Sequence, residues 1–283
     1  MLALPRKADA IHGAAGARHG GEAAALDSRG RSRALLTTAL VVSTLLLLLC
    51  SLVVGSRTIP FPDLFAALLH GGEADIENIV WDLRIPRTFV AYFAGAAIAV
   101  SGVIAQSWTR NPLADPGFIG ITAGASFLVA LGTTLGIATS TGMRTALALL
   151  GAGLATALVL GVSRRFQDPL TLVLVGAGVA AALSSSAMLI GLYSTDVLDS
   201  MRRWTIGSTF GRGPEDVAIA GVGLLIGLII AARVARPLDL LAMGEESSVA
   251  LGGSPTLARR GAALSIVVLA GCATAATGPI AFV

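Results

Sequence analysis

The sequence has 283 residues, of which 54% are hydrophobic and only 13% are charged, and its mean hydropathy is +0.80. A soluble domain carries about 25% charged residues, so this composition excludes a water-soluble protein and indicates a multi-span membrane protein. The net charge of +3 does not indicate nucleic-acid binding, because the arginines fall between apolar runs, where they mark membrane topology. The cysteines, Cys50 and Cys272, lie in apolar runs and lack the spacing of a metal site or a disulfide framework.

A helix that crosses the bilayer needs about 20 predominantly apolar residues. Seven runs without Asp, Glu, Lys or Arg reach or approach this length: Ala34–Gly55, Thr88–Trp108, Gly117–Gly142, Thr145–Val162, Leu170–Thr195, Val217–Ala232 and Gly261–Val283. The third and fifth are long enough to tilt or to contain re-entrant turns, and the helix of the short sixth run is expected to extend into neighbouring residues. The expected fold is therefore all-α, a polytopic transmembrane helix bundle with about seven spans.

Residues 1–33 are basic, rich in Ala and Gly, and without apolar periodicity, which predicts a disordered tail before a transmembrane domain over residues 34–283. The first run is longer than the hydrophobic region of a signal peptide and no clear cleavage site follows it, so an uncleaved first helix is expected. With the N-terminus inside, thirteen Lys and Arg lie on the cytoplasmic side and seven outside, which favours this orientation. Six of the thirteen belong to the tail, and without them each side carries seven.

Small residues recur at helical spacing inside the runs. Examples are Gly95, Ala99 and Gly102, then Gly151 and Ala155, then Gly176 and Ala180. Such residues let helix backbones approach closely in lipid, so these faces are predicted to be helix–helix contacts. Residues 176–181 also fit the Gly-x-Gly-x-x-Ala dinucleotide pattern, but that fingerprint needs a strand–turn–helix context, and here it lies deep in an uncharged run.

The segment Arg84–Arg87 reads Arg-Ile-Pro-Arg and precedes the second run. Pro86 is expected to hold Ile85 extended and suits the first turn of a helix, so both arginines should stay near the outer membrane surface. Interfacial snorkelling of arginine at a helix end explains this pattern without any partner, and spacing alone favours that explanation.

The segment Arg110–Pro116 reads Arg-Asn-Pro-Leu-Ala-Asp-Pro and is predicted to form a tight inner loop. Asn111 and Pro112, with the following Asp and Pro, are turn-forming residues that end a helix. Gln106, just before this loop, is expected to make a helix–helix hydrogen bond, with lining of a pathway as the alternative. Trp204–Ser208, beside Arg202 and Arg203, is placed on the outer side, and the preference of Trp for the membrane interface is enough to explain it.

The segment Arg236–Leu257 is a long polar stretch between the last two runs. One helical face holds Leu238, Leu241 and Ala242, and a second holds Glu245, Ser248 and Val249. Gly244 and Gly252 can end or cap short helices. The pattern predicts two short amphipathic helices on the cytoplasmic side, too polar to cross the membrane. An interfacial helix lying on lipid is the alternative interpretation.

The chain closes on Thr-Gly-Pro-Ile-Ala-Phe-Val at Thr277–Val283. The order of all these segments resembles the permease subunit of bacterial ABC importers for iron-siderophore, haem and cobalamin, the FecCD-type permeases. The matching motifs are Arg-Asn-Pro-Leu-Ala-x-Pro, Trp-x-x-Gly-Ser, Leu-Asp-Leu-Leu-Ala-Met-Gly-Glu-Glu with a later Leu-Gly, and the start of Gly-x-Ile-x-Phe-Val-Gly-Leu. Members of this family usually continue to ten spans, so a truncated or partial sequence is expected.

The resemblance implies a role for each segment. Arg84 and Arg87 are expected to form salt bridges with acidic residues of an extracytoplasmic substrate-binding protein. The coupling loop, at about residues 236–257, is expected to seat in a cleft of an ABC ATPase subunit. The coupling residues would be Leu241, Gly244, Glu245, Ser248, Leu251 and Gly252. Arg110, Asn111, Pro112 and Pro116 are expected to be structural.

The implied assembly lies in the bacterial plasma membrane and contains a second permease subunit, either a copy of this chain or a related one. This chain would bind no cofactor, because it lacks a Gly-x-x-x-x-Gly-Lys phosphate loop and its only lysine is Lys7. ATP would then be used by the partner subunit. An enzyme is not indicated, since no carboxylate pair lies within a run. A secondary transporter or channel for a small solute is the alternative, although the runs lack the ionisable residues that such proteins usually use.

Overall fold

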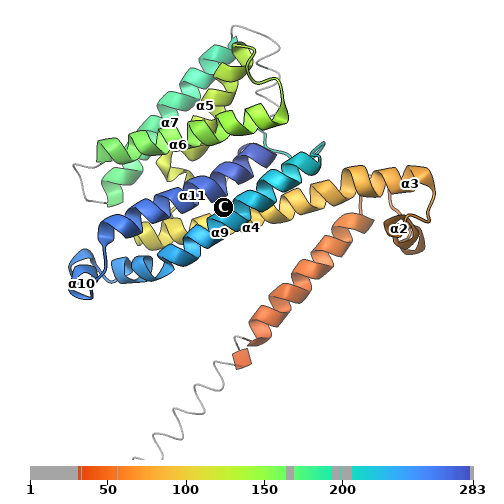
Figure 1. Ribbon diagram of the computed structural model, residues 1–283, viewed down its shortest axis with the longest axis horizontal. Coiled ribbons are helices and arrows are strands. Elements are labelled where there is room, and N and C mark those ends of the chain that lie inside the picture. The colour runs from red at the N-terminus through yellow and green to blue at the C-terminus, as the bar shows by residue number, and fades with distance from the viewer. Residues whose placement is uncertain are drawn as a thin grey trace, which may run out of the picture. The chain divides into compact units, whose positions relative to one another are not determined.

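The structure is a computed structural model that describes residues 31–32, 34–55, 57–163, 169–192, 198 and 206–280. Its regular elements over these residues are all helices, as the composition predicts (Figure 1). The chain forms two compact units, Met1–Phe61 and Pro62–Val283. The predicted tail falls outside the described residues, apart from residues 31 and 32.

The first unit contains the helix Ala34–Val53, whose 20 residues are enough to cross a bilayer. Its polar side chains bond to the helix itself. The hydroxyls of Thr37 and Thr44 donate to the carbonyl oxygens of Ala34 and Leu40, at 2.9 and 2.8 Å. Internal pairing of this kind suits a helix surrounded by lipid, where unpaired polar groups are costly.

The second unit begins with a short helix and a long helical stretch. The helices and their bounds are α2 (Phe61–Leu68), α3 (Ala74–Asn78), the π-helix η1 (Ile79–Arg84) and α4 (Ile85–Thr109). They are followed by the 3₁₀ helix η2 (Pro116–Ile119), α5 (Ile121–Thr134), α6 (Thr141–Ser163), α7 (Pro169–Leu192), α9 (Pro214–Ala242), α10 (Glu245–Ala250) and α11 (Pro255–Thr277). Of the described helices, six are long and apolar enough to cross a membrane.

The third predicted run, Gly117–Gly142, is the one that does not form a full-length span. Gly120, with a φ of 78°, separates η2 from α5. The 14 residues of α5 rise about 21 Å, which is less than the ~30 Å hydrocarbon core. The sixth run does extend into its neighbours as predicted, because α9 has 29 residues.

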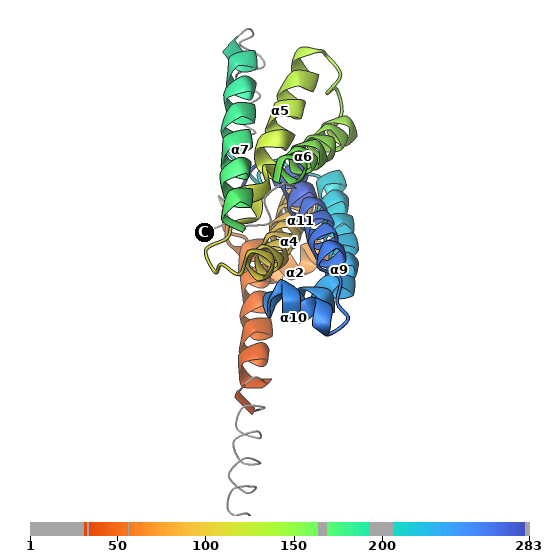
Figure 2. The same ribbon diagram turned by 90° about the vertical axis from the view of Figure 1, so that its left-hand side faces the viewer.

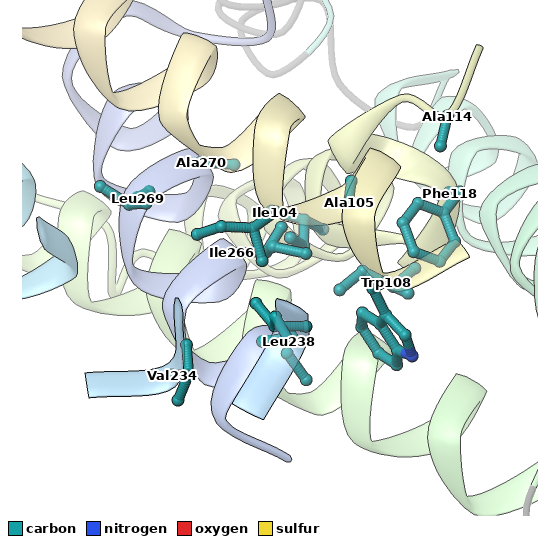
Figure 3. Packing of buried hydrophobic residues seen from close by; sticks show 14 of the residues in the cluster. Ile104, Ala105, Trp108, Ala114, Phe118, Val234, Leu238, Ile266, Leu269 and Ala270 are labelled. Atoms are coloured by element: carbon teal, nitrogen blue, oxygen red, sulfur yellow. The ribbon is translucent and has the colours of Figure 1, made fainter. Parts of the chain in front are cut away.

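The helices of the second unit pack in two groups (Figures 1 and 2). One group holds α4, α9 and α11, the other holds α5, α6 and α7, and α11 also packs against α6. A buried cluster joins the groups. Figure 3 shows Ile104 of α4, Leu238 of α9 and Ile266 of α11 within this cluster, with Phe118 of η2 beside Trp108.

Close backbone contacts confirm two of the three predicted small-residue faces. A Cβ atom added at Gly151 of α6 would overlap the carbonyl oxygen of Gly124 in α5, and one added at Gly176 of α7 would overlap that of Phe118. The third face differs in part: Gly102 of α4 is buried, but Gly95 and Ala99 are exposed in the described structure and nothing lies within 4 Å of a Cβ at Gly95.

Candidate functional site

The polar segment between the last two spans forms the turn of a helical hairpin made of α9, α10 and α11 (Figure 1). The prediction of two short helices here is wrong in one respect. Residues 236–242 are the last turns of α9, and Pro237 lies inside this helix. Leu238 and Leu241 are buried and hold the end of α9 against the core, so the helix continues past the proline. Ala242, which was predicted to share their face, is exposed.

Two glycines with positive φ bound α10. Gly244 has a φ of 118° and Gly252 a φ of 77°, values that residues with a side chain rarely adopt. Both glycines therefore turn the chain at the ends of a helix, as their positions in the sequence predict. The result is a single six-residue helix between two spans.

Ser248 is the buried residue of α10. It is 1% exposed, and its carbonyl oxygen accepts a 2.7 Å hydrogen bond from the Gly253 amide. A Cβ at Gly253 would lie 2.6 Å from the Ser248 Oγ, so a glycine is needed there for close packing. The Ser248 Oγ is buried without a hydrogen-bond partner in the described structure.

Glu245, in the first turn of α10, is paired with Arg259 of α11. The Arg259 Nη2 donates to the Glu245 Oε2 at 2.7 Å, and Nη1 lies 3.5 Å from Oε1. The pair is partly open to solvent, with side-chain exposures of 31% for Arg259 and 40% for Glu245. Glu245 was predicted from the resemblance to act on an outside partner, but in this structure its carboxylate is engaged within the chain.

The remaining side chains of this turn face outward. The large exposed ones are Met243, Glu246, Val249 and Leu251. The six predicted coupling residues thus divide into three sets. Leu241 and Ser248 are buried, Gly244 and Glu245 are half-buried, and Leu251 and Gly252 are exposed. The turn combines a buried apolar base with an exposed apolar and acidic surface.

The two spans of the hairpin are in close contact along their length. A Cβ at Gly227 of α9 would overlap Leu269 of α11, and one at Gly261 of α11 would overlap Val234 of α9. The buried Ser265 Oγ donates to the Gly227 carbonyl oxygen at 3.2 Å. Small residues and an interhelical hydrogen bond are the features that hold helices together in lipid, so the hairpin is a well-packed pair.

The loop after α4 has the tight geometry that its sequence predicts. Arg110 ends α4 with a φ of 52°. The Asn111 Oδ1 accepts from the Leu113 amide at 2.9 Å, and the Asp115 carboxylate accepts from the Gly117 amide at the start of η2. Pro116 is buried in the first turn of η2 and Pro112 is exposed. These bonds are local side-chain-to-backbone bonds of the kind that form turns.

The start of α4 differs from the prediction. Ile85 is helical, with φ −60° and ψ −53°, and is not extended. Its amide donates to the carbonyl of Val80, five residues back, at the end of the π-helix η1. Such a turn is wider than an α-turn, so it gives room to the ring of Pro86, which would otherwise press on the preceding turn. Arg84 is 8% exposed, whereas Arg87 is exposed.

The segment after the fifth run is described from Ile206 onward, so Arg202, Arg203 and Trp204 lie outside the described residues. The described part packs against the end of α11. The Ser208 amide donates to the Thr277 carbonyl oxygen at 2.7 Å, and a Cβ at Gly207 would overlap the Pro279 carbonyl oxygen. Arg212 lies 3.8 Å from Asp216 and fixes the loop to the first turn of α9.

The prediction from sequence motifs did not include two residues of this hairpin, Arg259 and Gly253. A signal for Arg259 exists in the sequence, because a Glu and an Arg lie on either side of Gly252 and Gly253, where a turn brings opposite charges together. Gly253 has no such signal, since the closeness of Ser248 is set by tertiary packing. In the part of the chain that the structure describes, no group of three His, Cys, Asp or Glu could hold a metal ion.

Residues 43–283 match the sequence model of the FecCD transport family. The ferric enterobactin transport system permease protein FepD of Escherichia coli is 35% identical over 255 residues, which cover 87% of this chain and 76% of that protein. The iron-uptake system permease protein FeuB of Bacillus subtilis is 29% identical, with 83% and 72% covered. A solved structure of a metal-chelate type ABC transporter in an inward-facing conformation superposes with a TM-score of 0.77 at 26% identity, covering 87% of this chain and 76% of that one.

Proposed function

This chain belongs to the FecCD transport family, and on that premise we propose that it is the permease subunit of an ATP-driven importer for iron–siderophore-type chelates. The observation that carries the proposal is the α9–α10–α11 hairpin, in which a short helix with an exposed surface ends two closely packed spans. The relatives support the substrate class, since the matched proteins of Escherichia coli are named for ferric enterobactin and Fe(3+) dicitrate.

The proposed assembly has several parts. An ABC ATPase subunit binds and hydrolyses ATP below the membrane, a binding protein delivers the chelate from outside, and a second permease subunit completes the path. This chain lies in the bacterial plasma membrane with its N-terminus in the cytoplasm, contacts lipid, and leaves ATP chemistry to the partner. Residues 236–257 then lie on the cytoplasmic side of the membrane, where the ATPase subunit can bind them.

The surface proposed for the ATPase is the outward side of the turn: Met243, Glu246, Val249 and Leu251. A rigid base and an exposed apolar patch with an acidic residue suit insertion into a cleft of another protein, because apolar side chains exclude water there while the charge sets the orientation. Leu241 and Ser248 support this surface from beneath, and Gly244 and Gly252 set the direction of α10.

The outer face offers Arg87 as the residue for docking the binding protein. It is exposed, whereas Arg84 is buried in the described structure and is better suited to fix the first turn of α4. Charge reversal in Arg87→Glu should weaken docking, most clearly at low ionic strength where exposed charges are least screened. Binding of the ATPase serves as the control and should stay unchanged. Equal docking by both forms at low salt would leave snorkelling as the explanation of Arg87.

Uptake of radiolabelled iron tests the proposal as a whole. The chain is reconstituted in vesicles with its ATPase and binding protein, and ferric enterobactin and ferric citrate are supplied as separate probes. Uptake should require ATP and should cease with an ATPase that cannot hydrolyse it. Uptake that continues with the inactive ATPase, or that a proton gradient drives, would contradict the proposal and favour a secondary transporter.

A further inference from the structure

The ion pair between Glu245 and Arg259 joins the short helix α10 to the span α11. Both guanidinium Nη atoms face the carboxylate, at 2.7 and 3.5 Å. Paired contacts of this kind fix an arginine and a carboxylate in a defined relative orientation. Among the described residues, the two bonds of this pair are the side-chain hydrogen bonds between α10 and α11.

The rest of α10 is held by few contacts. Ser248 is the only buried residue of this helix. Glycines with positive φ precede and follow it, and two backbone bonds link its end to the following turn, from the Gly252 amide to the Val249 carbonyl oxygen at 2.9 Å and from the Gly253 amide to the Ser248 carbonyl oxygen at 2.7 Å. Without the pair, the orientation of α10 relative to α11 would depend on one buried serine and two glycine turns.

Arg259, the other residue of the pair, lies in a closely packed part of α11. Arg259 lies in the second turn of α11, one residue after the fully buried Ala258. Two residues further on, Gly261 is in close contact with Val234 of α9, and Gly227 and Leu269 continue the same interface. A displacement that reaches Arg259 therefore reaches a span that is closely packed against α9.

We propose that Arg259 is a positioning residue that, through Glu245, makes α10 and α11 move together, so that force exerted on α10 by an ATPase is passed into the membrane. This inference depends on the proposed function, and it changes the role of Glu245 from a contact with the ATPase to an internal tie. The contact itself belongs to the exposed surface of Met243, Glu246, Val249 and Leu251.

Stability alone does not explain the pair. Partly exposed ion pairs contribute little to folding, about 0–1 kcal/mol, and both side chains here are partly exposed. Loss of Arg259 should therefore leave the fold intact and the exposed side chains of α10 still able to bind an ATPase. What it should change is the efficiency with which ATP hydrolysis is converted into transport.

The first test compares Arg259→Gln with Arg260→Gln in vesicles that contain the ATPase and the binding protein. Arg260 is the matched control, because it is the adjacent exposed arginine and makes no ion pair within the described residues. Arg259→Gln should still co-purify with the ATPase, but the iron taken up per ATP hydrolysed should fall at least about fivefold, the low end of typical coupling effects. Arg260→Gln should behave as the unaltered chain.

A charge exchange separates pairing from a simple need for arginine. Glu245→Arg and Arg259→Glu should each uncouple, and the double variant should recover most of the uptake per ATP. A double variant no better than either single one would overturn the proposal, as would an Arg259→Gln protein with the unaltered ratio.

A second measurement needs no ATPase. A spin label is attached at Val249→Cys in the chain alone, with Cys50 and Cys272 replaced by Ala. Its mobility should rise in Arg259→Gln and stay unchanged in Arg260→Gln, and equal mobility in all three proteins would overturn the tie. Failure of the unaltered chain to bind an ATPase or take up iron would instead contradict the proposed function, and the spin label would still decide whether the tie exists.

Discussion

The spans α11 and α7 have similar length but are used differently. In the most apolar window of α11, 67% of the residues are buried inside the protein, whereas in α7 the share is 11%. α11 packs on α4, α6 and α9, with a buried face that runs from Ala258 to Thr277. α7 packs on α5 and α6 with fewer buried residues, Leu172 and Ala187 among them, and Gly176 is in close contact with the Phe118 carbonyl oxygen.

This difference shows two ways of fixing a helix in lipid. Apolar side chains gain little by leaving a lipid environment for a protein interior, so close packing and hydrogen bonds hold the helices. α11 spreads its contacts over many residues, and a single change should have a graded effect. α7 has few buried residues and one tight backbone contact at Gly176, so a change there should have a large effect, while changes at its exposed positions should have almost none.

The largest expected effect is that of Gly176→Ala in α7. The added methyl group would overlap the Phe118 carbonyl oxygen, and such overpacking costs about 3 kcal/mol. Gly178→Ala is the control, because nothing lies within 4 Å of a Cβ there. Thermal unfolding in detergent should show a clear drop in the midpoint for the first variant only. Equal midpoints would mean that α7 is not held at this position.

An intermediate effect is expected for Ile266→Ala in α11. Ile266 is completely buried, and the cavity left by such a truncation costs about 2 kcal/mol, near the low end of the range for buried aliphatic residues, because lipid replaces water in the transfer step. Leu174→Ala in α7 removes a similar volume from a 64% exposed side chain and should be near neutral. The free energy of unfolding in lipid vesicles measures both changes. Similar losses at the two sites would remove the contrast between these helices.

The smallest expected effect is that of Ser265→Ala in α11. Its hydroxyl donates across the interface to the Gly227 carbonyl oxygen, and interhelical hydrogen bonds in membranes contribute about 0.6 kcal/mol. Ser186→Ala in α7 is matched, since that hydroxyl makes an exposed hydrogen bond to the Ala182 carbonyl oxygen of its own helix. The midpoint of thermal unfolding should fall measurably for Ser265→Ala and stay unchanged for Ser186→Ala. A larger fall for the α7 variant would contradict the idea that the interhelical hydrogen bond of Ser265 stabilises the fold.

Much of the fold follows from the sequence because length and apolarity decide which segments can cross a bilayer. Six of the seven predicted spans are helices of sufficient length. The third is shorter because Gly120 takes a positive φ and separates η2 from α5. The length of this run allowed for a re-entrant turn, but its apolar residues do not show where the chain turns. The prediction that Ile85 is extended was also wrong. A residue before proline usually avoids the helical conformation, but here the wider π-turn leaves space for the proline ring and Ile85 is helical.

The turn between the last two spans was predicted in position but not in detail. Glycines at 244 and 252 and the polar segment around them mark the turn, and the family motif strengthens that interpretation. Which side chains face outward depends on the packing of α9 against α11, and no periodicity over six residues can show it. The engagement of Glu245 by Arg259 is a tertiary contact of the same kind.

Gly244 has a wider consequence for how such a protein can change over evolution. Its backbone conformation, with φ 118° and ψ 153°, is one that glycine alone adopts readily, so the direction in which α10 leaves α9 is set by a residue without a side chain. The outward residues of α10 do not determine this direction. If the turn meets an ATPase, partner choice could diversify by surface substitution while the angle of approach is inherited unchanged.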